Sequence, residues 1–246
     1  VHGRFFQTVD GFDTAECAAD LAFSMGGDGT FLTVAEKVRD RRIPILGINT
    51  GHLGFLAEVT TSGLETAIAR VVRGEYEVQE RSLIAIEDED KELTLYPFAL
   101  NEVALLKYDN SSLIEVETRV EGALLANYLA DGLIICTPTG STAYSLSVGG
   151  PVLEPQSATI CLSPIAPHSL TVRPVVLRDD VTVEVHVRSR SGRFLLSVDG
   201  RSETLSADRV LRIHKAHYTL PVVSIPPHHF FSTLREKMMW GKDRRH

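Results

Sequence analysis

The sequence is poor in cysteine, and its cysteines follow no recognisable pattern. Only three occur in 246 residues, Cys17, Cys136 and Cys161, and no two of them form a Cys-x-x-Cys pair. An odd number of widely spaced cysteines excludes a disulfide framework and favours a reducing compartment. We therefore expect a cytoplasmic protein whose cysteines are small core residues.

Long apolar runs and an excess of positive charge are also missing. No apolar stretch is long enough to span a bilayer, and the N-terminus lacks the basic-then-apolar pattern of a signal peptide. The formal net charge of -7 argues against a nucleic-acid or anionic membrane surface, while leaving a local basic site open. We expect no nucleic-acid partner and no membrane partner.

Several catalytic motifs are absent as well. The chain has no Gly-x-x-x-x-Gly-Lys-Ser/Thr loop, no Gly-x-Gly-x-x-Gly turn and no Gly-x-Ser-x-Gly elbow. A P-loop NTPase is thereby excluded, and the other two classes find no support. His214 and His217 stand in a β-like segment without a convincing metal-ligand set, so we interpret them as surface residues.

The most informative feature present is a glycine-rich turn that contains an acid, at residues 26–30. It follows an apolar, strand-like run at 21–25 and precedes a helix-compatible stretch at 31–38. Glycine N–H groups and a helix N-terminus are where α/β proteins hold phosphate. A carboxylate repels phosphate, so we interpret Asp28 as a base for an attacking hydroxyl or a group acting through a metal. The alternative is a tight turn in which Asp28 caps the helix.

The hydrophobic periodicity changes along the chain. The first third alternates strand and helix signals, with a helix at 31–39 and a strand at 43–48, as in a parallel sheet. Ser62 and Glu65 form a capping box for a second helix, which Gly74 ends.

From about Tyr76 the period is two. Apolar and polar residues alternate at 114–120 and 181–187, which predicts antiparallel strands. The dipeptide Asp199-Gly200 between residues 194–198 and 202–205 predicts a two-residue hairpin, and we interpret it as a plain turn.

We therefore expect an α/β plus β fold in two domains. A Rossmann-like α/β domain covers 1–78 and is completed by 226–246, and a β-rich domain covers 79–225. A last helix at 231–240 needs a partner surface, so we expect the C-terminal segment to pack back on the first domain. No complete α/β unit precedes Leu21, so we expect the opening strand and helix of that domain to be missing.

A second glycine-rich turn, at 47–55, follows the next predicted strand. Successive strand ends of a parallel sheet form one crevice, so this turn is expected at the same sheet edge as Asp28. Phe55 is able to stack on a base and His52 to donate to a phosphate. Packed or solvated loop residues are the alternative interpretation.

Two further polar segments stand among apolar runs. Asn101-Glu102 offers an amide beside a carboxylate, which suits ribose hydroxyls; an edge strand with solvent-facing polar residues is the alternative. In residues 131–147, Asp131 precedes a buried-looking strand and a turn rich in hydroxyls, including Thr139 and Thr142. Caps and turns alone do not explain that cluster, which suits a polar, planar ligand.

With these features in this order, the chain resembles the NAD kinase family. The resemblance extends from about Leu21 to the C-terminus. The GGDG turn alone is shared with phosphofructokinases and lipid kinases, but the combination is highly specific. The matching segments are GGDGT, GINTGHLGF, Asn101-Glu102, DGLIICTPTGSTAYS, GGP at 149–151, PHSL at 167–170 and RP at 173–174.

The resemblance implies transfer of the γ-phosphoryl group of ATP, or of polyphosphate, to the 2′-hydroxyl of the adenosine ribose of NAD, giving NADP. It implies Asp28 as the proton acceptor, Mg²⁺ or another divalent metal on the ATP, and a homodimer or homotetramer with its site near a subunit boundary. The residues implied to contact the dinucleotide are Gly29, Phe55, Asn101, Glu102, Asp131, Thr139, Thr142, Ala143, Tyr144, Ser145, Ser147 and Ala166.

Two alternatives remain at this point. A lipid kinase that shares the GGDG turn requires an apolar groove for an acyl chain, and no exposed apolar stripe is visible in the sequence. A non-catalytic dinucleotide-binding sensor would keep the pocket without needing Asp28.

Overall fold

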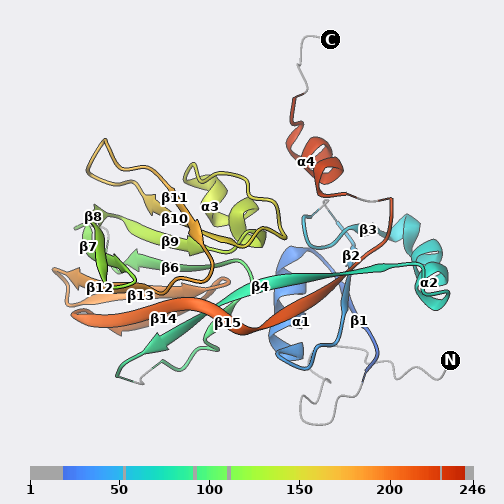
Figure 1. The fold of residues 1–246 in the computed structure, drawn as a ribbon, viewed down its shortest axis with the longest axis horizontal. Coiled ribbons are helices and arrows are strands. Elements are labelled where there is room, and N and C mark those ends of the chain that lie inside the picture. The colour runs from blue at the N-terminus through green and yellow to red at the C-terminus, as the bar shows by residue number, and fades with distance from the viewer. Residues whose placement is uncertain (1–18, 52–53, 91–92, 110–111, 228, 242–246) are drawn as a thin grey trace. The chain divides into compact units, whose positions relative to one another are not determined.

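A computed structural model describes five stretches of the chain, which form two compact units. Residues 1–81 with 219–246 make the first unit, and 82–218 make the second. The expectation that no complete α/β unit precedes Leu21 concerns residues 1–18, which lie outside the described part. The described stretches are 19–51, 54–90, 93–109, 112–227 and 229–241 (Figure 1).

The first unit is an α/β structure with parallel strand pairing. Strand β1 pairs with β2, and β2 pairs with β3 and with the end of β15, where Val222 lies opposite Ile45. The elements wholly in this unit are β1 (Ala22–Met25), α1 (Asp28–Val38), β2 (Ile45–Asn49), β3 (Val59–Thr60), the 3-10 helix η2 (Thr61–Gly63), α2 (Leu64–Val72) and α4 (Phe230–Met238).

Hydrophobic spacing explains why α1 packs as it does. Phe31, Ala35 and Val38 recur at helical spacing and are buried on one stripe. Every residue of β2 is buried, as expected for a parallel strand covered on both faces. The predicted alternation of strand, helix and strand is confirmed, with α1 beginning at Asp28.

One local prediction in this unit is wrong. Ser62 and Glu65 form no capping box, because the chain enters α2 through η2 and Gly63 is the N-cap. The Ser62 hydroxyl lies 3.0 Å from Thr60 Oγ1 instead. The predicted stop is confirmed, because Gly74 has a φ of 72° and its N–H bonds to the carbonyl of Val71.

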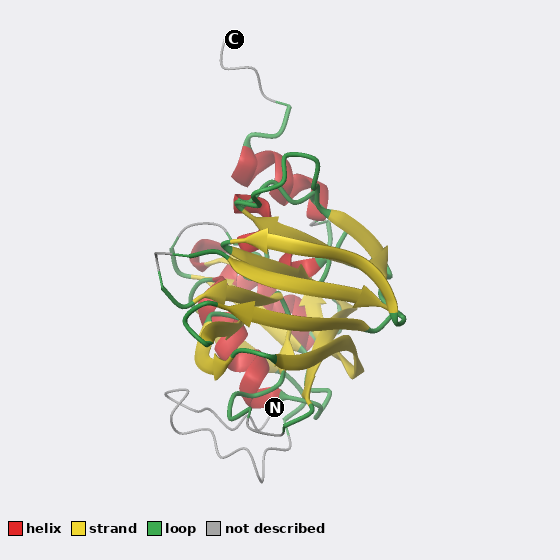
Figure 2. Cartoon of the chain, turned by 90° about the vertical axis from the view of Figure 1, so that its left-hand side faces the viewer, coloured by secondary structure: helices red, strands yellow, loops and turns green. Residues whose placement is uncertain are grey.

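The second unit contains two antiparallel sheets. One has the order β11-β10-β9-β6-β13-β14. Figure 2 shows strands side by side in a twisted sheet. In the other, β7 pairs with β8 and β12, and β12 pairs with the first part of β15. The strands concerned are β4 (Glu77–Asp88), β5 (Phe98–Ala99), β6 (Glu102–Lys107), β7 (Ile114–Val120), β8 (Ala123–Ala130), β9 (Gly132–Cys136), β10 (Thr159–Ile165), β11 (Val175–Arg178), β12 (Val183–Ser189), β13 (Arg193–Val198), β14 (Arg201–Ser206) and β15 (Arg209–Ser224).

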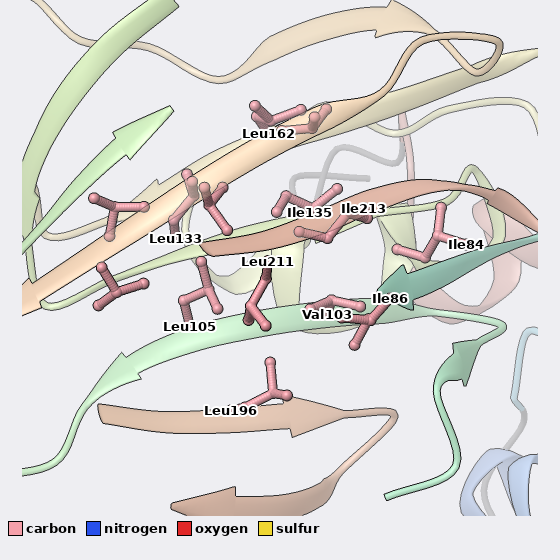
Figure 3. Close-up of a cluster of buried hydrophobic side chains, with 14 of the residues drawn as sticks. Ile84, Ile86, Val103, Leu105, Leu133, Ile135, Leu162, Leu196, Leu211 and Ile213 are labelled. Carbon is pink, nitrogen blue, oxygen red and sulfur yellow. The ribbon is translucent and has the colours of Figure 1, made fainter. Parts of the chain in front are cut away.

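Alternating side chains put a core on each face of the β6 and β9 pair. Val103 and Ile135 point into a cluster shared with the other sheet, where Ile213 joins them (Figure 3). Ala104 and Ile134, one residue along, join a second, smaller cluster. The period of two therefore fixes which side chains fill the sandwich.

The expected α/β plus β architecture is confirmed, and the C-terminal segment belongs to the first unit. The predicted hairpin is also confirmed, because β13 and β14 pair around Asp199 and Gly200, whose φ angles are 47° and 81°. Within the described residues, no helix is long and apolar enough to cross a membrane.

Candidate active site

In the first unit, the two glycine turns meet at the Asp28 carboxylate. Its Oδ2 accepts the N–H of Phe55 at 2.9 Å, and its Oδ1 accepts the N–H groups of Leu56 and Ala57 at 3.1 and 3.2 Å. The expectation that both turns lie at one sheet edge is therefore confirmed. Because three donors hold the carboxylate, its direction is fixed while its side chain stays 30% exposed.

The carboxylate does not cap α1. Gly27 is the N-cap, no side chain caps this end, and Asp28 is the first helical residue. The capping interpretation is therefore wrong, and the first turn of α1 keeps backbone N–H groups available for an anion.

Close packing around Asp28 explains one glycine, and one amide shapes the adjoining loop. A Cβ on Gly54 would lie 1.9 Å from Asp28 Oδ1, so no side chain fits there. Asn49 shapes the same loop by accepting the N–H of Gly51 at 2.7 Å. Gly29 has open space around its Cβ position. His52 lies outside the described residues.

In the second unit, a buried carboxylate holds the Asn101-Glu102 turn. Asp199 accepts the N–H of Leu100 at 2.7 Å, of Asn101 at 2.8 Å and of Glu102 at 3.0 Å. The sequence interpretation of Asp199-Gly200 as a plain turn is wrong in this respect, because the hairpin also supplies the acceptor that orients this turn. Only the Asp-Gly dipeptide signalled the position.

The turn that follows β9 also forms hydrogen bonds to the backbone of the Asn101-Glu102 turn. Thr137 donates its N–H to the carbonyl of Asn101 at 2.9 Å, and its hydroxyl bonds to the carbonyl of Leu100. The 3-10 helix η3 (Thr139–Thr142) follows, and the N–H of Gly140 donates to the Thr137 hydroxyl at 3.1 Å. Asn101 and the hydroxyl-rich segment are thus brought together.

Two buried oxygens at this place have no hydrogen-bond partner among the described residues, Glu102 Oε2 and Thr139 Oγ1. Burial and the nearby Asp199 carboxylate raise the pKa of Glu102 to about 7, against the opposing N–H of Tyr144. Buried acceptors are normally satisfied, so these atoms favour a ligand that supplies donors.

The remaining residues of the hydroxyl-rich segment differ in exposure. Ser145 is buried and its hydroxyl lies 2.8 Å from that of Ser163, so its side chain supports the fold of α3 (Tyr144–Ser147). Tyr144 and Ser147 are exposed, and Thr142 and Ala143 are half-buried. Thr142 donates to the carbonyl of Thr139 at 3.3 Å.

Asp131 and Ala166 lie together but away from Glu102. The N–H of Asp131 donates to the carbonyl of Ile165, next to Ala166. In the β6 and β9 pair, Glu102 lies opposite Cys136 at one end and Gly132 lies at the other. Five residue steps at about 3.3 Å each, from Cys136 to Asp131, separate the two groups. Asp131 also forms an ion pair with Lys107, Nζ to Oδ1 at 2.6 Å.

Replacing Gly140 with Ala tests the close contact between the backbone of η3 and that of Asn101. The new Cβ would lie 2.0 Å from the carbonyl oxygen of Asn101 and 2.6 Å from its Cα, so the turn must shift. We expect the free energy of unfolding to fall by about 1–3 kcal/mol, measured by urea denaturation, and the affinity for the dinucleotide to fall with it. Gly63→Ala is the control, because its nearest atom is Thr60 Oγ1 at 3.5 Å. Equal behaviour of the two variants would show that the close approach is not needed.

The described part of the chain contains no group of three or more His, Cys, Asp or Glu side chains that could hold a metal ion. A carboxylate fixed beside glycine backbone at a helix N-terminus suits removal of a proton next to a phosphate. That is the chemistry of a phosphotransferase that acts on a hydroxyl group.

Comparisons with known proteins identify the family. Residues 5–76 match the family model of the ATP-NAD kinase N-terminal domain, and residues 100–225 match that of the ATP-NAD kinase C-terminal domain. An NAD kinase of Bacteroides fragilis is 53% identical over 236 residues, which is 96% of this chain and 81% of the relative. One of Flavobacterium johnsoniae is 41% identical over 245 residues, 98% of this chain and 82% of the relative. The chain belongs to the NAD kinase family.

Solved structures agree with this. Yeast NADH kinase, in a complex with NADH, has a TM-score of 0.85 and 26% identity, covering 92% of this chain and 68% of the yeast chain. An NAD kinase from Archaeoglobus fulgidus, in a complex with ATP, has a TM-score of 0.77 and 31% identity, covering 89% of this chain and 83% of that one. The resemblance seen in the sequence motifs is confirmed.

Proposed function

We propose that this chain transfers the γ-phosphoryl group of ATP to the 2′-hydroxyl of the adenosine ribose of NAD, with Asp28 as the proton acceptor. The observation that carries the role of Asp28 is its set of three fixed hydrogen bonds. A carboxylate has about four acceptor positions, so one remains for the ribose hydroxyl. The relatives crystallised with ATP and with NADH support these substrates.

Positioning supplies most of the rate in this proposal. A ribose hydroxyl is a poor nucleophile and a carboxylate is a weak base, so Asp28 takes the proton late, as the new bond to phosphorus forms. When bound to the triphosphate, Mg²⁺ neutralises part of its charge. The phosphate oxygens of the donor are the hard ligands that Mg²⁺ prefers.

In the second unit, Glu102 and Thr139 are proposed to contact the dinucleotide. Glu102 and Thr139 each present a buried oxygen without a partner among the described residues, and donors on the ligand would satisfy both. Asp131 and Ala166, at the other end of β9, are proposed to contact a different part of a dinucleotide. The other proposed contacts are Gly29, Phe55, Asn101, Thr142, Ala143, Tyr144, Ser145 and Ser147.

We also propose a homodimer or homotetramer in the cytoplasm. The free, buried thiols of Cys136 and Cys161 support a reducing compartment. Size-exclusion chromatography with light scattering measures the assembly, and a monomer at micromolar concentration would contradict it.

The direct test is a coupled assay. The protein is incubated with Mg-ATP and NAD, and an NADP-specific dehydrogenase detects the product. Polyphosphate replaces ATP in a second series, which decides the donor. Bound NAD without any NADP formed would favour the non-catalytic sensor.

The pKa of Glu102 predicts how NAD binding depends on pH. We expect the KM for NAD to fall as the pH rises from 6 to 8, because the carboxylate accepts sugar hydroxyls better than the protonated acid. Burial, the Asp199 carboxylate and the N–H of Tyr144 are what act on the pKa of Glu102. Glu102→Gln should flatten this dependence and raise the KM at pH 8. Steady-state kinetics at several pH values measure both.

The same pKa predicts that the stability of the folded chain falls as the pH rises. The pKa of Glu102 in the folded chain lies above its ordinary value of 4.5, so this group's contribution to stability is lost as the pH rises from about 4.5 through 7. Glu102→Gln is therefore expected to be more stable than the wild type at pH 8 and equal to it at pH 4.5. Glu77→Gln, at an exposed position of β4, is the control. A wild-type KM for NAD that stays constant from pH 6 to pH 8 would contradict the proposed role of Glu102.

A further inference from the structure

The C-terminal helix α4 places a cation beside the proposed catalytic carboxylate, within the first unit. The ammonium nitrogen of Lys237 lies 3.8 Å from Asp28 Oδ2 and 4.6 Å from the centre of the Phe55 ring. Nothing in the sequence pattern pointed to this residue.

Other residues hold α4 in place. Thr233 and Leu234 are buried, and the Phe230 ring lies 6.1 Å from that of Phe55. Lys237 is four residues after Thr233 and three after Leu234, so it continues the same side of the helix. The helix therefore has apolar contacts of its own that fix where the Lys237 stem begins.

The contacts of Lys237 are too weak to explain it as a structural residue. The distance to Asp28 exceeds that of a hydrogen bond, and the two side chains are 36% and 30% exposed. Ion pairs of this kind contribute little to stability, and the ring contact is modest at an exposed site. Asp28 already accepts three backbone N–H groups, so it does not depend on Lys237 for its orientation.

A phosphoryl donor bound at the Asp28 turn would explain the position of the Lys237 ammonium group. A triphosphate beside Asp28 brings several negative charges next to a carboxylate, and more charge gathers on the transferred oxygens in the transition state. An ammonium group with three donors on a flexible stem is able to reach those oxygens.

We propose that Lys237 is a further catalytic residue, which contacts the phosphate chain of the donor nucleotide at the Asp28 turn. This inference rests on the proposed function of that turn. Bound to phosphate, the ammonium group offsets the charge that Asp28 and the donor place together, and it carries no covalent step.

Two substitutions separate charge from packing. Lys237→Met keeps the apolar stem and removes the charge, whereas Lys237→Arg keeps the charge. We expect Lys237→Met to lower kcat/KM for ATP at least about 10-fold while the KM for NAD stays within about twofold, and Lys237→Arg to keep most of the activity. Arg235→Met, exposed on the same helix, is the matched control and should equal the wild type.

Thermal unfolding and direct binding of Mg-ATP, measured by calorimetry without NAD, complete the test. Weaker ATP binding with an unchanged unfolding midpoint would support the proposal. A Lys237→Met enzyme within about twofold of an active wild type would overturn it, as would a loss matched in Arg235→Met or explained by lower stability. A wild type that makes no NADP would instead overturn the proposed function itself.

Discussion

Replacing Asp28 with Asn is expected to lower turnover by about 100-fold or more while NAD binding persists. The amide cannot accept the proton that leaves the ribose hydroxyl, although it has nearly the same size. The coupled assay measures the rate, and calorimetry measures NAD binding. Asp40→Asn, at an exposed position after α1, is the control.

The geometry of Asp28 also predicts a structural effect of this substitution. One carboxylate oxygen accepts the N–H of Phe55 and the other accepts those of Leu56 and Ala57, so an amide NH₂ must face at least one N–H group. We expect a loss of about 1–3 kcal/mol in the free energy of unfolding. Stability and rate must therefore be measured on the same preparation. If Asp28→Asn loses this stability but keeps most of its rate, Asp28 only holds the second glycine turn.

Replacing Asp199 with Asn is expected to impair the second unit more than any other isosteric change there. Asparagine tolerates the positive φ of 47° at this turn, so the hairpin itself survives. The amide can no longer accept all three N–H groups of Leu100, Asn101 and Glu102, which leaves a buried donor unpaired. We expect the free energy of unfolding to fall by about 2 kcal/mol and the KM for NAD to rise at least about 10-fold.

Asp208→Asn provides the matched control. Asp208 also has a positive φ, of 61°, but its side chain is 80% exposed, so the same substitution leaves no buried donor without an acceptor. Urea denaturation and NAD kinetics on both variants measure the difference. Identical behaviour of the two would mean that the Asn101-Glu102 turn keeps its shape without the carboxylate.

Local signals were sufficient for much of the fold. Glycines and an acid between an apolar strand and an apolar helix placed Asp28 in a turn that leads into a helix at 31–39, because turn chemistry and helix periodicity act over a few residues. The helix itself begins three residues earlier, at Asp28. Local signals likewise predicted the Asp199-Gly200 hairpin and the alternation in β7 and β12. The general rule for strand ends of a parallel sheet also predicted that the second glycine-rich turn, at 47–55, lies at the same sheet edge as Asp28.

Local signals failed to predict the start of α2, which depends on the preceding strand. Ser62 and Glu65 have the spacing of a capping box, but the chain continues from β3 directly into a 3-10 turn, which moves the N-cap to Gly63. The spacing between Ser62 and Glu65 cannot show how β3 leads into the helix. The overall resemblance to a family was unaffected, because it depended on several motifs together.

The sequence by itself determined the family, the α/β plus β order and the turn that carries Asp28, since each of these is encoded in residues close to one another along the chain. Only the tertiary structure decided that Asp199 holds the Asn101-Glu102 turn, that Asp131 lies at the far end of β9 from Glu102, and that Lys237 stands beside Asp28. Strand register and helix docking bring together residues that are distant in the chain, and these depend on the packing of whole elements.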